Sequence, residues 1–276
     1  MTRRLLALPA MLMVVVFVVV PYLNIVVMSF RTPSPTAIHG PGFTIANYAR
    51  AHTDSLYLGL LADTLRYAVA TTSISLVLAF PVAFHLARTE SRWRGLLYAG
   101  VLSPLLTGVV IRCFGWIILL ANNGLVNQGL ALVGLGPYRF INGVGVTIAL
   151  VHVFLPFMIL PIMNAIQSID PRLAEAARTL GASGRHTFFR VTLPLSAPGI
   201  HSGVVLVFVL SASAYIIPML LGGGRVQTLP TVVVQQLMGG LLWPFGATLA
   251  LILSLTALAI IAVFAALTRP SMQRVR

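Results

Sequence analysis

The 276-residue sequence contains no lysine, one cysteine and only five acidic residues. A Walker A phosphate-binding loop requires a lysine, so this chain cannot supply such a loop for ATP hydrolysis. Because Cys113 is the only cysteine, an intramolecular disulfide is excluded, and its apolar neighbours favour a small core residue. Only 8% of the residues are charged. This scarcity of charge excludes a water-soluble domain and predicts an integral membrane protein.

Apolar residues make up most of the sequence: 58% of the chain is hydrophobic and the mean hydropathy is +0.96. The net charge of +13 comes entirely from arginine. These arginines lie mainly in short segments between apolar runs, where they orient a membrane protein rather than form a groove. Nucleic acid is therefore not an expected partner.

Six apolar stretches are long enough to cross a bilayer, which predicts an all-α, polytopic membrane protein with about six transmembrane helices. The expected spans are 5–30, 60–87, 96–121, 144–166, 197–221 and 245–267. We expect a bend at Pro21 and an interruption at Pro104. Segments 31–59 and 225–242 are predicted to be outer loops. The apolar piece 125–135 is too short to cross, so we expect a re-entrant or interfacial helix there.

The arginines also predict the orientation of the chain. With both termini on one side, twelve arginines fall on that side, and Arg31, Arg50, Arg139 and Arg225 fall on the other. The positive-inside rule then places both termini in the cytoplasm. The polar segment 170–194, which lies between the fourth and fifth spans, falls on the same side.

Segment 170–194 carries its own helix signals. Asp170 can cap a helix, Pro171 suits its first position, and Gly181 can adopt the left-handed conformation that ends it. Ser183 can cap a second short helix. One narrow apolar face is expected on the first helix, formed at helical spacing by Leu173, Ala176, Ala177 and Leu180.

The spacing within this segment resembles the EAA loop of ABC-transporter permeases. Glu175-Ala176-Ala177 is followed after three residues by Gly181, and after nine more by Val191-Thr192-Leu193-Pro194, with Val191 at the family's isoleucine position. The resemblance implies a coupling helix that sits in a cleft of a separate ATPase subunit. The residues it assigns to this contact are Arg172, Glu175, Ala176, Ala177, Leu180 and Gly181. An ordinary cytoplasmic loop with good caps is the alternative.

Other stretches are similar to the spermidine/putrescine-type permeases of this family. They are Glu90-Ser91-Arg92-Trp93, the run from Pro104 to Trp116, Asn122 to Asn127, and Pro218 to Gly223. The resemblance implies the transmembrane fold of type I ABC importers and a multi-pass permease of the bacterial inner membrane. Such a subunit forms half of a solute pathway, here for a polyamine. Related permeases for other small organic or inorganic solutes share parts of these motifs, so those solutes stay open.

The family resemblance also implies a set of partners. These are a dimer of ABC ATPase subunits, a second permease that is similar or identical, an extracytoplasmic solute-binding protein and membrane lipid. No cofactor, metal or catalytic residue is expected in this chain. We treat residues 1–276 as one permease domain, with 1–59 as a peripheral helix and outer loop, 60–268 as the transport core, and 170–194 as the coupling loop.

Four residues are candidates for the solute pathway. Arg112 lies inside the third span, where a charge costs about 2.5–3.5 kcal/mol, so it should face protein or water. A structural pair or snorkelling explains it equally well. Asp63 is the only acidic residue in a predicted span and could attract a cation, although a local pair with Arg66 is favoured. Tyr215 and Pro218 could line an outer gate or simply serve tight helix packing.

Two other function classes remain to be weighed. Gly181-Ala182-Ser183-Gly184 has the G-x-S-G string of rhomboid intramembrane proteases, with His201 or His186 as the possible base. An arginine-rich loop is a poor place for that serine, which disfavours the reading. An ion-coupled secondary transporter would need carboxylates or histidines within the membrane. Asp63 and His85 near helix ends and His152 in the fourth span offer little support for that role.

Overall fold

The computed structural model describes residues 12–13 and 15–273, with side chains as far as Thr268. Within this part of the chain every regular secondary-structure element is a helix. The one strand-like pairing is an isolated bridge between Arg31 and Phe43. The predicted all-α class is therefore confirmed. Arg3, Arg4, Arg274 and Arg276, on which the predicted orientation partly depends, lie outside the described residues, as does the Arg269 side chain.

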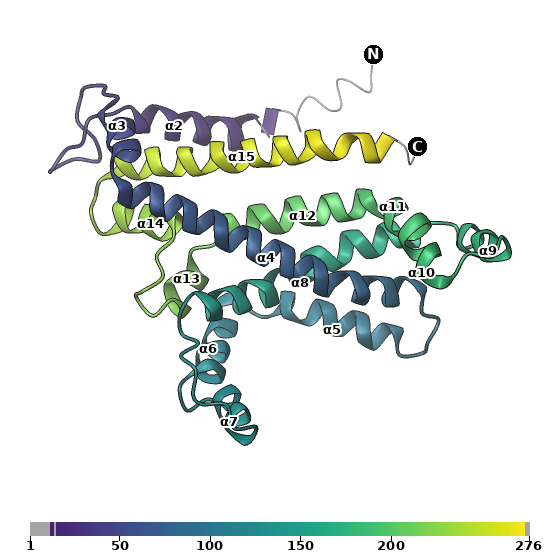
Figure 1. Ribbon diagram of the computed structural model, residues 1–276. Coiled ribbons are helices and arrows are strands. Elements are labelled where there is room, and N and C mark those ends of the chain that lie inside the picture. The colour runs from purple at the N-terminus through teal and green to yellow at the C-terminus, as the bar shows by residue number, and fades with distance from the viewer. Residues whose placement is uncertain (1–11, 14, 274–276) are drawn as a thin grey trace, which may run out of the picture. The chain divides into compact units, whose positions relative to one another are not determined.

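The helices follow the chain in the order labelled in Figure 1. Their bounds are η1 (Val15–Val19, a π-helical turn), α2 (Val20–Ser29), α3 (Ala46–Thr53), α4 (Ser55–Arg88), α5 (Arg94–Leu106), α6 (Val109–Leu120), α7 (Leu125–Leu132), α8 (Gly143–Gln167), α9 (Pro171–Thr179), α10 (Gly184–Thr187), η2 (Phe188–Thr192, π-helical), α11 (Leu193–Leu195), α12 (Ala197–Ala212), α13 (Ile216–Leu221), α14 (Leu229–Met238) and α15 (Trp243–Gln273).

Four of the described helical stretches are long and apolar enough to cross a membrane: α4, the stretch Val109–Leu132, α8 and α15. A fifth results if Gly184–Leu195 and α12, which meet at a 62° bend, count as one span. Within the first expected span Val15–Ser29 is an apolar helical stretch, and residues 5–11 and 14 are not described. The predicted fourth and sixth spans match α8 and α15 closely.

The third expected span is two helices, and its break lies beyond Pro104 rather than at it. Pro104 lacks the N–H that would bond the Gly100 carbonyl, but the Ser103 hydroxyl donates to that carbonyl at 3.0 Å. Helix α5 therefore continues to Leu106. Thr107 and Gly108 are extended, with ψ values of 138° and 141°, and α6 starts at the next residue.

The fifth expected span is also shorter than predicted. Helix α12 ends at Ala212, three non-helical residues follow, and Pro218 lies in the separate short helix α13. The segments expected as outer loops contain helices α3 and α14. In α14 the Thr231 hydroxyl accepts from the Thr228 backbone N–H at 2.9 Å, which caps a helix where apolar periodicity alone is weak.

The chain divides into two compact units. One holds the described residues up to Ala62 together with 228–256, and the other holds 63–227 together with the rest of α15. The core of the first unit packs Tyr57 and Leu60 against Leu229, Phe245 and Leu249. In the same unit, the Thr248 hydroxyl and the Asn47 amide both donate to the Ser29 carbonyl, each at 3.1 Å.

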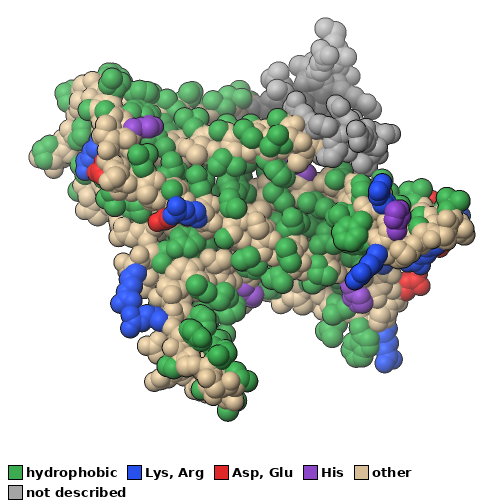
Figure 2. All heavy atoms as spheres, in the orientation of Figure 1, with side chains coloured by type: hydrophobic (Ala, Val, Ile, Leu, Met, Phe, Trp, Pro, Cys, Tyr) green, Lys and Arg blue, Asp and Glu red, His purple; other side chains and the backbone are tan. Residues whose placement is uncertain are grey.

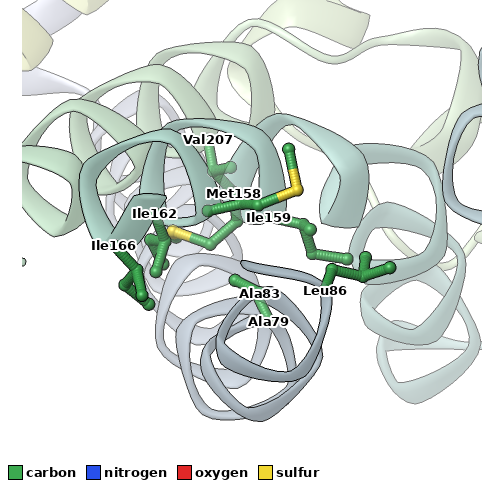
Figure 3. Close-up of a cluster of buried hydrophobic side chains, with 9 residues drawn as sticks. Ala79, Ala83, Leu86, Met158, Ile159, Ile162, Ile166 and Val207 are labelled. Carbon is green, nitrogen blue, oxygen red and sulfur yellow. The ribbon is translucent and has the colours of Figure 1, made fainter. Parts of the chain in front are cut away.

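The second unit is built around α8, which lies between α5 and α12 (Figure 1). Figure 3 shows its largest core cluster, in which Ala79 and Ala83 of α4 face the isoleucines and Met158 of α8. Helices α8 and α12 pack unusually closely. A Cβ atom on Gly199 would lie 2.5 Å from the Pro161 carbonyl oxygen, so no larger residue fits without a shift. These two helices flank the 170–194 segment in the sequence.

Candidate functional site

Helix α9 has the caps that the sequence predicts. The Asp170 carboxylate accepts from the Arg172 backbone N–H at 2.9 Å, and Pro171 lies at the helix start. At the other end, Gly181 has a φ of +84°. The Gly181 N–H donates to the Arg178 carbonyl at 2.9 Å, and the Ala182 N–H donates to the Ala177 carbonyl at 3.0 Å. This pair of bonds is the Schellman motif, which ends the helix in one defined direction.

The apolar face of α9 is not covered by the rest of the chain. Leu180 is 89% exposed and Leu173 is 49% exposed. Between Leu180 and the following short helix lies an open groove of about 620 Å³, which is also lined by Ser183, His186 and Arg190. An exposed apolar stripe next to a basic groove is a surface suited to another protein. Glu175 is also exposed, and none of its contacts within the described residues is an ion pair.

Charged side chains gather around this helix. Arginine, histidine and acidic side chains crowd the part of the surface formed by the α9 and α10 region, whereas hydrophobic side chains cover much of the visible face elsewhere (Figure 2). The segment holds Arg172, Arg178, Arg185, Arg190 and His186 against Asp170 and Glu175. Its surface is therefore polar and mainly basic, apart from the apolar stripe.

Aromatic packing attaches the 170–194 segment to the helices of its unit. The Phe188 ring makes edge-on contacts with Phe80 and Phe84 of α4, at centroid distances of 5.4 and 6.0 Å. The Arg88 guanidinium donates to the Ile169 carbonyl at 3.2 Å, just before α9. The segment then enters α12 through the 62° bend. Short, folded connections thus join α9 to the close-packed pair α8 and α12.

Arg112 lies in the first turn of α6 next to a polar pair. The Trp116 indole N–H donates to Nδ1 of His152 on α8 at 3.1 Å, and the two rings meet edge-on at 5.5 Å. Arg112 precedes Trp116 by four residues, so the two side chains lie on the same face of α6. The Nε and Nη1 atoms of Arg112 are buried, and neither has a hydrogen-bond partner among the described residues.

The other three pathway candidates lie on α4 and in or just before α13. Asp63 forms an ion pair with Arg66 at 2.8 Å, which is the local pair that the sequence favours. Tyr215 is the residue before α13 and is 37% exposed. Pro218 is buried in α13, and its carbonyl accepts the Gly222 N–H at 2.9 Å.

The geometry does not support a catalytic serine. The Ser183 hydroxyl caps α10 by accepting from the His186 backbone N–H at 3.3 Å. The His201 ring instead stacks on Phe264 at a centroid distance of 5.1 Å. Among the described side chains no group of three or more histidine, cysteine or acidic residues could hold a metal ion.

Comparison with known proteins decides the family. The model of the binding-protein-dependent transport system inner membrane component matches residues 2–275. The chain belongs to this family. It is a transport subunit of ABC importers in the inner membrane and has no enzymatic role of its own, as the sequence predicts.

Individual relatives agree with this assignment. The spermidine/putrescine transport system permease protein PotB of Haemophilus influenzae is 35% identical over 251 residues, which are 90% of this chain and 87% of that protein. The molybdenum transport system permease protein ModB of Azotobacter vinelandii is 34% identical over 64% of this chain and 78% of its own length. A bacterial ABC transporter that imports the acidic polysaccharide alginate contains a chain with a TM-score of 0.73, at 18% identity, covering 98% of this chain and 95% of that one. This last likeness establishes the type I importer fold.

Proposed function

We propose that this binding-protein-dependent permease carries a polyamine of the spermidine/putrescine class. The observation that supports the substrate class is the 35% identity to the Haemophilus influenzae polyamine permease, which extends over nine-tenths of the chain. The motifs around Trp93, Trp116 and Asn127 point to the same branch of the family. The relative that carries molybdenum, which covers less of the chain, makes a small oxyanion the second candidate.

Coupling to ATP is assigned to helix α9. Its EAA spacing, its defined caps and its uncovered apolar stripe support a docking contact with a cleft on a separate ATPase. The residues proposed to make this contact are Arg172, Glu175, Ala176, Ala177, Leu180 and Gly181. Closure of the ATPase dimer would displace α9, and the packed pair α8 and α12 would carry this displacement into the membrane.

The assembly we propose contains two ABC ATPase subunits, a second permease that is similar or identical, and an extracytoplasmic solute-binding protein. Both termini and the 170–194 segment lie in the cytoplasm in this arrangement, as the positive-inside rule indicates. The single permease domain has residues 60–268 as its transport core and residues 1–59 at its periphery. Membrane lipid covers the remaining apolar surface.

The solute pathway is proposed to pass Asp63, Arg112, Tyr215 and Pro218. Their contribution to binding a polycation is limited, because Asp63 is already paired with Arg66 and Arg112 carries the wrong sign of charge. Asp63 is the only carboxylate within α4, α5, α6, α8, α12 or the described part of α15. We therefore expect the second permease to supply the fixed negative charge that balances a polyamine.

The test is uptake by the complete complex, purified from its native membrane and reconstituted into liposomes with its binding protein. ATP-dependent accumulation of radiolabelled spermidine or putrescine, but not of molybdate, is the expected result. Accumulation of molybdate alone would overturn the polyamine assignment and leave the permease assignment in place. A chain that transports without any ATPase would overturn the coupling proposal.

A further inference from the structure

Two helices of the second unit end inside the thickness of the membrane rather than at its surfaces. Helix α5 stops at Leu106, before the extended residues Thr107 and Gly108. Helix α12 stops at Ala212, and Ser213 to Tyr215 separate it from α13. Helix α8, which both of them contact, runs unbroken for 25 residues and provides a scale for their depth.

The contacts with α8 give the depth of each break. Arg94 and Tyr98 of α5 share a pocket with Asn164 and Gln167 near the end of α8. Further along, Val101 packs with the cluster that contains Met158 and Ile162, whereas beyond the break Trp116 bonds His152. The Thr107–Gly108 break therefore lies level with the middle of α8.

The second break lies somewhat closer to the start of α8. Gly203 of α12 meets Met158, and beyond the break Ile217 packs in a cluster with Val146 and Val153. Residues 213–215 thus lie between these levels, still within the span. Both breaks therefore lie beside the membrane-spanning length of the same central helix, α8.

The residues at both breaks are exposed on the surface of this chain. Thr107, Gly108, Ser213 and Tyr215 are all exposed. Lipid cannot satisfy the free carbonyls and N–H groups of an unwound backbone, so irregular backbone at this depth occurs only where it lines an aqueous cavity or is covered by protein. This surface therefore faces the pathway or the second permease, and not lipid.

The exposed hydroxyls at the two breaks have the same chemistry. The Thr107 hydroxyl donates to the carbonyls of Ser103 and Pro104, each at 3.3 Å. The Ser213 hydroxyl donates to the Val209 carbonyl at 2.9 Å and has a longer contact of 3.3 Å with the Leu210 carbonyl. Because each hydroxyl proton is donated to a carbonyl of its own helix, the oxygen lone pairs that face outward can only accept hydrogen bonds.

Other groups at the breaks strengthen this acceptor character. Several of the last carbonyls of α5 and α12 lack the N–H groups that a further helical turn would supply, although in α12 the Val209 and Ser211 carbonyls accept from the Ser213 and Ala214 N–H groups. Tyr215 adds an exposed aromatic ring, whose face attracts cations. The Nε and Nη1 atoms of Arg112 are buried, so these two donors are not offered to the open side.

We propose that the breaks at Thr107–Gly108 and Ser213–Tyr215 are the solute-contact surface of this half of the pathway, and that they bind alkylammonium groups through neutral oxygen acceptors. This inference rests on the proposed polyamine transport and assigns the contact to particular residues of this chain. Unwound helices at mid-membrane are a recurring way to bind ions and small solutes in transporters.

The single native cysteine makes accessibility measurable. In a Cys113→Ser background, one cysteine is introduced at Thr107, Ser213, Leu78 or Leu258. The last two are exposed control positions in unbroken helices, Leu78 in α4 and Leu258 in α15, and each adjoins a buried cluster at a comparable depth. The complete complex in liposomes is treated with a water-soluble, membrane-impermeant thiosulfonate, with and without spermidine.

Modification at 107 and 213, slowed by spermidine, with no modification at 78 and 258, is the expected result. Equal modification at all four positions, or none at 107 and 213, would overturn the proposal. If wild-type complex accumulates spermidine while 107 and 213 stay unreactive, this inference fails alone. If an oxyanion protects the two positions and spermidine does not, the acceptor argument fails together with the polyamine assignment.

A second set of variants separates binding from folding. Thr107→Val keeps the shape of the side chain and removes its acceptor, whereas Thr107→Ser keeps the hydroxyl. We expect Thr107→Val to raise the KM for spermidine with the same amount of assembled complex, and Thr107→Ser to restore the wild-type KM. Equal KM values for the two variants would contradict the assigned role.

Discussion

Gly181 allows a direct test of how the C-terminal end of α9 contributes to coupling, because a substitution there changes backbone strain and little else. Its φ of +84° lies in the left-handed region, and a Cβ atom added there would meet no atom within 4 Å. Replacement by alanine therefore adds backbone strain without a clash. That strain is about 1–2 kcal/mol for a residue with a Cβ, which lowers the equilibrium constant between the native loop end and its alternatives by about 5- to 30-fold.

Two matched variants complete this experiment. Gly181→Asn introduces a larger side chain, but asparagine visits the left-handed region far more readily than alanine. Gly184→Ala lies three residues further on, where the added Cβ also meets nothing and φ is not positive. We expect both of these variants to transport nearly as well as the wild type and Gly181→Ala to transport much less.

The assay is ATP-dependent uptake by the reconstituted complex, read together with ATP hydrolysis and the amount of ATPase that stays bound. We expect Gly181→Ala to lower uptake per ATP hydrolysed while the transmembrane helices remain folded. Equal effects of Gly181→Ala and Gly181→Asn would refute the argument from backbone strain. A larger defect in Gly184→Ala than in Gly181→Ala would refute it as well.

Three further predictions address other parts of the chain. Glu175→Arg should leave membrane insertion intact and abolish uptake while ATP is still hydrolysed, whereas Glu175→Gln should reduce uptake less. Normal coupling of ATP hydrolysis to uptake in Glu175→Arg would refute the docking role of α9. Gly199→Leu should overpack the contact between α8 and α12 and lower the free energy of unfolding by about 1–3 kcal/mol, which is measured as a fall in Tm in detergent. The control Gly100→Leu, at a position where the space is open, should have little effect. Trp116→Phe should remove the hydrogen bond to His152 and cost about 0.6 kcal/mol of stability, the typical value for a side-chain hydrogen bond within membranes. A double-mutant cycle with His152→Leu that shows no coupling energy would count against that bond.

The sequence predicts the ends of α9 well because its caps are local. Asp170, Pro171 and Gly181 each act within one or two turns, and the structure places all three as their residue types predict. Long apolar runs likewise predict α8 and α15, since hydropathy alone specifies them. Helix ends that depend on local caps, and spans that consist of long apolar runs, can therefore be predicted without tertiary information.

Helix breaks inside the membrane are harder to predict, because they depend on competing hydrogen bonds. Pro104 looks like the interruption, yet the Ser103 hydroxyl serves the carbonyl that the proline leaves free, and the helix ends at Thr107 instead. Ser213 ends α12 in the same way, before Pro218. A serine or threonine near a proline in an apolar run is the available signal, and it does not by itself tell which residue ends the helix.

Contacts between distant residues have no sequence signal in a single chain. The bond between Trp116 and His152 joins residues 36 positions apart. Helix α14 is also not predicted, because its apolar residues lie between glycines and some of its packing partners, such as Tyr57 and Leu60, lie far away in the sequence. Tertiary packing decides these features, and only the structure reveals them.

The most direct test of the central claim, that α9 docks on a separate ATPase, is affinity purification of the tagged chain from mild detergent. Leu180 is the position to change, because it is 89% exposed and Leu180→Asp therefore does not disturb packing within the chain. The account predicts that an ABC ATPase is recovered with the wild type and is largely lost with Leu180→Asp. A chain that purifies alone, or equal recovery of the ATPase with both proteins, would contradict it.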